Sequence, residues 1–197
     1  MAWALDNRYI GKVDQLNFMV ERGTPDKYSL ADIEKVIKWL PAINKLLIDS
    51  TDLPKDIKVQ HWKTAADMNA NLEYMLLVSW GSRIDKECEY ELGRLATRAK
   101  TVAFTITNST DTDMDLFFKG VQQELEEKTA NCEQMYFDWS YSVDFVEKFK
   151  DKVKQLGWFA DIEDWTNEGK LYMNSAFIKS KSSVSPDDFK DLLSIDF

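Results

Sequence analysis

Two apolar runs, separated by a helical segment, follow each other closely between residues 73 and 107. The run EYMLLVSW (73–80) is almost continuously apolar, which is typical of a strand that is buried on both faces. A helix predicted at 85–99 then leads directly into a second strand-like run, TVAFTIT (101–107). This succession predicts two adjacent parallel strands that are joined by the helix, since parallel neighbours need a crossover connection.

Strands and helices also alternate along most of the remaining chain. The further strands that we expect are 15–20, 56–62 and 133–140, and the further helices are 29–48, 114–128 and 143–156. Pro41 should bend the helix at 29–48 or divide it in two. Such alternation is typical of a parallel sheet with helices on both faces. We therefore predict an α/β domain over residues 1–157, a flavodoxin-like three-layer fold with a five-stranded parallel sheet.

Residues 158–197 have a different pattern. The runs FADIEDW and KLYMNSAFIKS are joined by the turn sequence TNEG, which predicts an antiparallel β-hairpin. Ser185 and Pro186 then stand where a short terminal helix would begin. We expect the hairpin and helix to form a C-terminal appendage that packs on the edge of the sheet or on a partner.

The acidic charge of the chain limits its partners. Its 34 Asp and Glu residues against 25 Lys and Arg residues give a formal net charge of −9 and a pI near 4.7. Nucleic acids and anionic membranes would repel such a chain, so we expect neither as a partner. The two distant cysteines, Cys88 and Cys132, make no disulfide framework. With no signal-peptide pattern and no apolar run near the ~20 residues of a membrane span, we expect a cytoplasmic protein.

The sequence contains none of the common nucleotide-binding or metal-binding motifs. It has no P-loop and no G-x-G-x-x-G, H-E-x-x-H or G-x-S-x-G pattern, which argues against kinases, Walker-type NTPases and zinc proteases. His61 is the only histidine and cannot anchor a His-rich metal site. The acidic clusters DTDMD and QELEE lack the spacing of an EF-hand, and we interpret the second as a solvated helix face. We expect no metal and no cofactor.

Glu91 lies beside the apolar stripe of the helix predicted at 85–99. The stripe consists of Cys88, Leu92, Leu95, Ala96 and Ala99. At about 100° per residue, Glu91 falls at the flank of this stripe. That position suits a carboxylate in the wall of a cleft. It also suits an ion pair with Arg94, three residues further along the helix, which is the more common role of an acidic residue at a helix flank, and the spacing alone leaves both alternatives open.

The loop SWGSRID, between the apolar strand and this helix, is a candidate ligand-binding segment. Ligands of open parallel sheets bind beyond the carboxyl ends of the strands, and this loop leaves such an end. Its glycine and serines offer a flexible backbone and hydroxyl donors, its arginine suits a phosphate, and tryptophans suit stacking on a base. The predicted substrate-binding residues are Ser79, Trp80, Gly81, Ser82, Arg83 and Trp62.

The segment LLVSWGSRIDKECEYELGRLATRAKTVAFTIT (76–107) resembles part of two related protein families. In TIR domains, a strand ending in serine precedes a Trp-Cys-x-x-Glu-Leu pattern, of which Cys88, Glu91 and Leu92 are present here. In nucleoside 2-deoxyribosyltransferase-like N-glycosidases, a similar helix carries Glu-Leu-Gly-Arg-Ala, which is similar to ELGRL (91–95). The resemblance implies an α/β fold in which Glu91 acts at a ribose while the bond to the base is cleaved.

Two functional hypotheses follow. The first, implied by the resemblance, is a TIR-like hydrolase, namely an N-glycosidase that cleaves or senses NAD or a related nucleotide. Its catalytic residue would be Glu91, and the protein would tend to self-associate. The nucleotide would be its substrate or ligand. The second is a non-enzymatic acidic protein-binding module, such as an inhibitor or immunity-type protein, which neutralises a basic partner surface. The net charge and the seven tryptophans favour the second hypothesis, because tryptophan is a favoured interface anchor.

Overall fold

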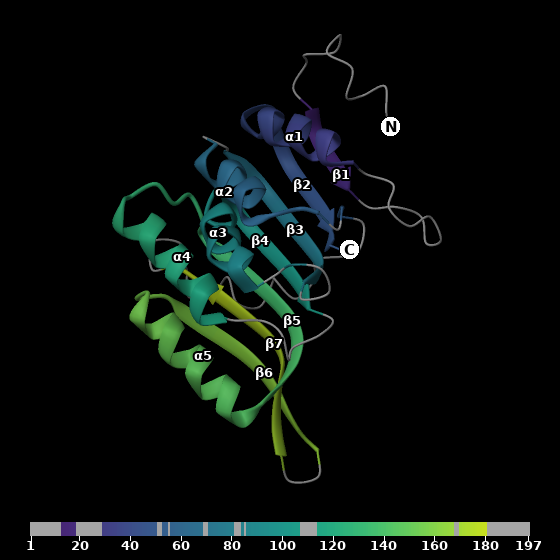
Figure 1. The fold of residues 1–197 in the computed structure, drawn as a ribbon. Helices are drawn as coiled ribbons and strands as arrows, with labels where there is room; N and C mark the ends of the chain where they lie inside the picture. Colours follow the sequence, from purple (N-terminus) through teal and green to yellow (C-terminus); the bar gives the residue numbers. More distant parts are fainter. Residues whose placement is uncertain are drawn as a thin grey trace.

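The chain forms an α/β fold around a seven-stranded, mostly parallel sheet (Figure 1), so the predicted α/β class is confirmed. The computed structural model describes residues 13–18, 29–50, 53–54, 56–68, 71–80, 84, 86–106, 114–167 and 170–180. The strands are β1 (Val13–Phe18), β2 (Ile43–Asp49), β3 (Leu72–Trp80), β4 (Ala99–Ile106), β5 (Gln134–Ser142), β6 (Phe159–Asn167) and β7 (Lys170–Lys179). The helices are α1 (Leu30–Trp39), α2 (Val59–Asp67), α3 (Lys86–Ala96), α4 (Met114–Glu126) and α5 (Val143–Gln155), with a short 3₁₀ helix, η2, at Leu40–Ala42.

Strands β1 to β5 are parallel and lie side by side in the order of the sequence. β3 and β4 are neighbours that α3 connects, as the two apolar runs predicted. The order 1-2-3-4-5 differs from the flavodoxin-like order 2-1-3-4-5, in which the chain reverses direction after the second strand. The predicted flavodoxin-like order is therefore wrong. Alternating strands and helices indicate the fold class, but they do not indicate the direction in which each crossover moves.

All five described α-helices cover one face of the sheet (Figure 1). Each of the helices α1 to α4 contacts the next one, and Phe149 of α5 packs edge-on against Phe137 of β5, beside Phe118 of α4. This one-sided arrangement follows from the strand order, because right-handed crossovers that advance in one direction place every helix on the same side. The described residues thus form two layers, and the second helix layer of the predicted three-layer fold is not among them.

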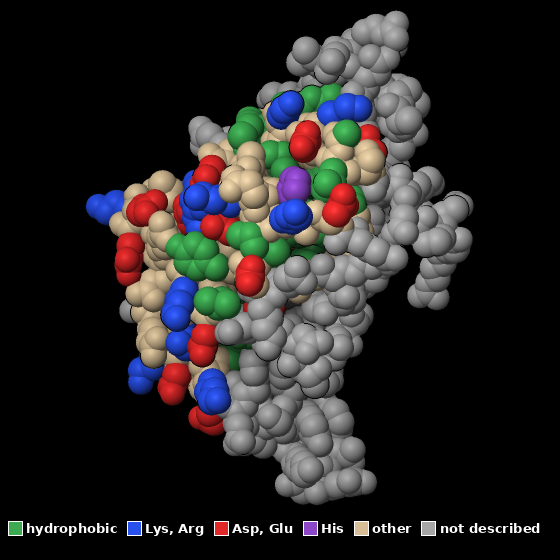
Figure 2. All heavy atoms as spheres, viewed as in Figure 1, with side chains coloured by type: hydrophobic (Ala, Val, Ile, Leu, Met, Phe, Trp, Pro, Cys, Tyr) green, Lys and Arg blue, Asp and Glu red, His purple; other side chains and the backbone are tan. Residues whose placement is uncertain are grey.

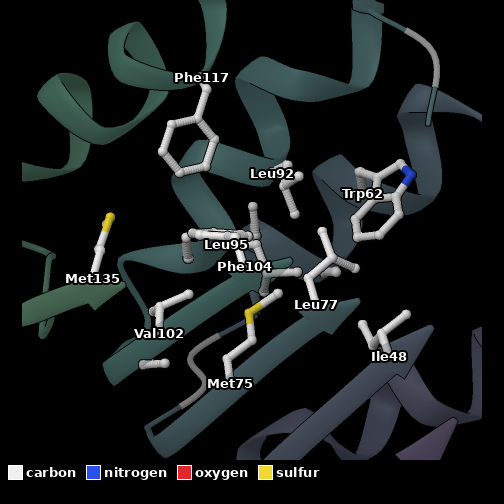
Figure 3. Packing of buried hydrophobic residues seen from close by; sticks show 14 of the residues in the cluster. Ile48, Trp62, Met75, Leu77, Leu92, Leu95, Val102, Phe104, Phe117 and Met135 are labelled. Carbon is white, nitrogen blue, oxygen red and sulfur yellow. The ribbon is translucent and has the colours of Figure 1, made fainter. Parts of the chain in front are cut away.

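The two faces of the sheet differ in burial, as the alternation of side chains along each strand requires. Positions that face the helices are buried; they include Leu46, Met75, Leu77, Val102, Phe104, Met135 and Phe137. Positions on the opposite face are half-buried; they include Leu47, Tyr74, Leu76, Thr101 and Tyr136. Figure 3 shows Leu92 and Leu95 of α3 and Phe117 of α4 packed onto the buried face. The hydrophobic core therefore lies between the sheet and the single helix layer.

Two segments near the N-terminus have a secondary structure other than the one predicted. Residues 43–49, expected as the second half of a helix, form β2, because Pro41 ends the helical segment within η2. Residues 56–62, expected as a strand, mostly belong to α2. Ile57 and Val59 alternate as in a strand, but the buried face of α2 is formed by residues at helical spacing, namely Trp62, Ala65 and Ala66.

The ends of two helices agree with their predicted caps. Ser29 and Asp32 form a capping box at the start of α1, and their hydrogen bonds lower the pKa of the Asp32 carboxyl group. Gly157 follows α5 with a φ of 71°, in the left-handed region that favours glycine. Local capping chemistry therefore marked these helix ends correctly.

The predicted C-terminal hairpin is confirmed, and it extends the same sheet. β7 pairs antiparallel with β5, and β6 pairs antiparallel with β7, so β6 is the last strand in the order of the described sheet. The short helix predicted to begin at Ser185 lies outside the described residues. The division of the chain into two units at residue 157 stays a prediction.

Helices α3 and α4 approach each other closely at two glycines. A Cβ atom on Gly93 would overlap the carbonyl oxygen of Phe117, and one on Gly120 would overlap the carbonyl oxygen of Tyr90. The backbone of each helix therefore occupies the space that a side chain would need on the other. This contact fixes the distance between α3 and α4 within the helix layer.

We expect Gly93→Ala to lower the free energy of unfolding by at least about 2 kcal/mol, because overpacking commonly costs about 1–3 kcal/mol and backbone atoms move less easily than side chains. Urea denaturation measures this change. Lys119→Ala, at an exposed position of α4, is the control and should change stability by less than about 0.5 kcal/mol. An unchanged unfolding midpoint for Gly93→Ala would contradict the close helix contact.

Candidate functional site

Glu91 lies in the middle of α3, and its carboxylate forms an ion pair with Arg94. Glu91 Oε2 lies 2.8 Å from Arg94 Nη1, and the Glu91 side chain is only 10% exposed. Of the two alternatives that the helical spacing left open, the described structure contains the ion pair.

Arg94 contacts two further carboxylates on neighbouring helices. Its Nη2 lies 2.8 Å from Asp67 Oδ1 at the end of α2, and its Nε lies 2.7 Å from Glu124 Oε1 on α4. Burial alone would lower the pKa of Arg94, but the hydrogen bonds to Glu91, Asp67 and Glu124 outweigh this effect and raise the pKa above its ordinary value. One side chain therefore links α2, α3 and α4 as a permanent cation.

Glu124 is fully buried and is shared by two arginines. Its Oε1 accepts from Arg94, while its Oε2 lies 2.8 Å from Arg98 Nη2 and also accepts a hydrogen bond from the Thr129 hydroxyl. These partners offset the cost of removing a carboxylate from water. The interpretation of QELEE as a solvated face is therefore wrong for Glu124. The sequence does contain the signal, because Glu124 follows Val121 by three residues, on the buried stripe of α4.

The ionic cluster, which we define as Asp67, Glu91, Arg94, Arg98 and Glu124, extends toward the amino-terminal edge of the sheet. Arg98 lies in the turn before β4 and donates to the carbonyl of Ala66, at 3.1 Å, and to that of Thr129, at 3.2 Å. These two residues lie in the segments that lead into β3 and β5. Ligands of open parallel sheets bind at the opposite edge, beyond the carboxyl ends of the strands.

The predicted ligand-binding loop is only partly described. Ser79 and Trp80 form the carboxyl end of β3, where the register with β4 shifts between Leu77 and Trp80, and the structure describes only their backbone. The other three predicted binding residues of the loop, Gly81, Ser82 and Arg83, lie outside the described residues. Whether these residues meet around a ligand stays a prediction.

Trp62, the remaining predicted ligand-binding residue, lies on α2 in the hydrophobic core (Figure 3). Its side chain is 4% exposed and lines an apolar cavity of about 40 Å³ between α1, α2 and β2. Its indole N–H has no hydrogen-bond partner among the described residues. Ligand pockets commonly have volumes of roughly 300 Å³ or more, so a nucleotide does not fit into this cavity.

His61 and the two cysteines have local structural contacts. His61 Nδ1 accepts a hydrogen bond of 3.0 Å from the Lys58 backbone N–H at the start of α2. Cys88 and Cys132 are buried and form no disulfide, and burial raises the pKa of the Cys132 thiol to about 12, so this thiol stays protonated. Within the described part of the chain, no group of three or more His, Cys, Asp or Glu side chains could hold a metal ion.

Comparison of the chain with protein-family models, curated proteins and solved structures finds no match. The resemblance of residues 76–107 to TIR-like and deoxyribosyltransferase-like proteins therefore stays a prediction. Among the helices of the described residues, none combines the length and apolar character that crossing a bilayer requires.

We expect Glu124→Gln to lower the free energy of unfolding by about 3–5 kcal/mol, because it removes the carboxylate that two largely buried guanidinium groups share. Chemical denaturation followed by circular dichroism measures the loss. Glu126→Gln removes the same charge from an exposed position of the same helix and should cost less than about 0.5 kcal/mol. Similar small losses for both variants would show that the ionic cluster does not stabilise the fold.

Proposed function

We propose that this chain is a non-catalytic, acidic protein-binding module whose partner is basic at the contact. The observation that carries this proposal is the environment of Glu91. A carboxylate that stabilises an oxocarbenium-like state must reach the ribose of its substrate. Glu91 is largely buried and paired with Arg94, which also binds Asp67 and Glu124. This environment favours a structural role for Glu91 over a catalytic one.

The strand order supports the same proposal. In doubly wound sheets, a ligand crevice opens where the strand order reverses and neighbouring crossovers leave to opposite faces. Among the described strands, β1 to β5 contain no such reversal, and α1 to α4 pack against one another along one face. The described fold therefore lacks the feature that provides the nucleotide crevice in flavodoxin-like proteins.

The net charge supports the partner class. A formal charge of −9 attracts basic protein surfaces and repels nucleic acids. Figure 2 shows that acidic and basic side chains are interspersed over the helix layer and form no surface of a single sign there. We therefore place the partner contact outside the helix layer.

A nucleotide-directed N-glycosidase is the second candidate, and one observation favours it. β3, α3 and β4 have the parallel arrangement that the resemblance implies, and the register shift near Trp80 lies at the carboxyl edge, where a nucleotide would bind. In this candidate, Glu91 would have to exchange its contact with Arg94 for the ribose.

Turnover and binding assays on one preparation distinguish the two candidates. Wild-type protein incubated with NAD, NADP and purine nucleosides should release no nicotinamide or base, as measured by chromatography. Its association with a basic protein should slow by about tenfold or more as salt rises to physiological strength. Glu91→Gln should leave that association unchanged, as should Glu87→Gln, the exposed control on the same helix. A different result would contradict the proposal and establish the N-glycosidase: the wild type releases a base, Glu91→Gln abolishes this release, and Glu87→Gln retains it.

A further inference from the structure

The strand β6 lies at the end of the described sheet and has a strand partner on one side only. It pairs with β7 over nine register positions, from Phe159 to Asn167, and no described strand lies on its other side. Among the described residues, the backbone N–H and C=O groups on that side have no strand partner, as at the edge of a sheet to which a further strand can be added. Such an edge can bind an extended peptide through main-chain hydrogen bonds.

The start of β6 is accessible on both faces. Phe159 is 46% exposed, and Ala160 and Asp161 are also exposed, while Ile162 is half-buried. Because successive side chains of a strand point to opposite faces, three consecutive exposed residues indicate that neither face is covered there. Phe159 is thus an exposed aromatic side chain beside an open edge, which suits it as an interface anchor.

The charge of β6 indicates what kind of segment could pair with it. Its sequence FADIEDWTN contains Asp161, Glu163 and Asp164 but no lysine or arginine. Pairing with β6 of a second copy would bring acidic residues together across the strands, which is unfavourable. A segment rich in lysine or arginine would instead bring opposite charges together. The edge is therefore suited to a basic partner and unsuited to self-pairing.

We propose that β6 binds an extended basic segment of another protein as an additional strand of the sheet. The backbone hydrogen bonds would supply affinity, the acidic residues would select a basic sequence, and Phe159 would cover an apolar part of the bound segment. This inference rests on the proposed function and specifies its contact surface.

Three synthetic peptides test the mode of binding. The first is a nine-residue peptide of alternating Lys and Thr, the second replaces each Lys by Glu, and the third is the Lys–Thr peptide with N-methyl groups on alternate backbone nitrogens. We expect the first to bind the full chain and to slow amide exchange in β6, and the other two to bind at least tenfold more weakly. Equal binding of the N-methylated peptide, or no binding of the Lys–Thr peptide, would overturn the proposal.

Matched charge variants test the location. The variant with Asp161→Asn, Glu163→Gln and Asp164→Asn should weaken binding of the Lys–Thr peptide at least tenfold. Its control, Glu34→Gln with Glu87→Gln and Glu127→Gln, removes the same charge from exposed positions on α1, on α3 and in the turn after α4 and should weaken binding less than twofold. An equal effect of the two variants would overturn the proposal. If the β6 variant does not fold, the N-methylated peptide still decides the outcome on the wild type.

These outcomes also distinguish this inference from the proposed function. If the chain associates with a basic protein in a salt-sensitive way, and the β6 variant does not weaken this association, strand addition at β6 is overturned. The proposal of a protein-binding module then still holds. Release of a base from a nucleotide by the wild type would contradict the proposed function, whatever the peptides show.

Discussion

The ion pair between Arg94 and Glu124 is the contact on which the packing of α2, α3 and α4 depends. The two charges lie on different helices and are largely withdrawn from water, so each requires the other. Gly93 and Gly120 allow the backbones of α3 and α4 to approach closely enough for this pair to form. Asp67 and Arg98 then connect the pair to α2 and to the turn before β4. In this arrangement, Glu91 is one of the anions that hold Arg94 in place.

The parts of the fold that could be predicted are those that local sequence determines. The apolar run of β3 indicated a central strand, and the following helix brings the chain back to form β4, so this unit was evident from residues 73–107. The expected burial on both faces is only partly met, because Tyr74 and Leu76 on the face away from the helices are half-buried. The direction of each crossover depends instead on tertiary packing, which a single sequence does not reveal. β2 was missed because its apolar residues continue the pattern of α1 beyond Pro41, and α2 was missed because Ile57 and Val59 alternate like strand residues.

The candidate site shows the same distinction between local and distant contacts. Helical spacing correctly placed Arg94 within reach of Glu91, because the two residues lie one turn apart on α3. Arg94 also contacts Asp67 and Glu124, which lie on other helices, and the sequence around Glu91 does not predict these contacts. Glu124 lies on the apolar stripe of α4, but we interpreted it as part of a solvated face because it stands in an acidic run. Burial of a charge is decided by distant partners, and these become apparent only in the folded chain.

The most direct test of a structural role for Glu91 is a double-mutant cycle with Arg94. The free energies of unfolding of Glu91→Gln, Arg94→Met and the double variant are measured against the wild type by urea denaturation. If the two side chains bind each other in the folded protein, the loss in the double variant should be smaller than the sum of the single losses by about 1–3 kcal/mol. Strictly additive losses would show that Glu91 is not held by Arg94, and would contradict the structural role on which the proposed function rests.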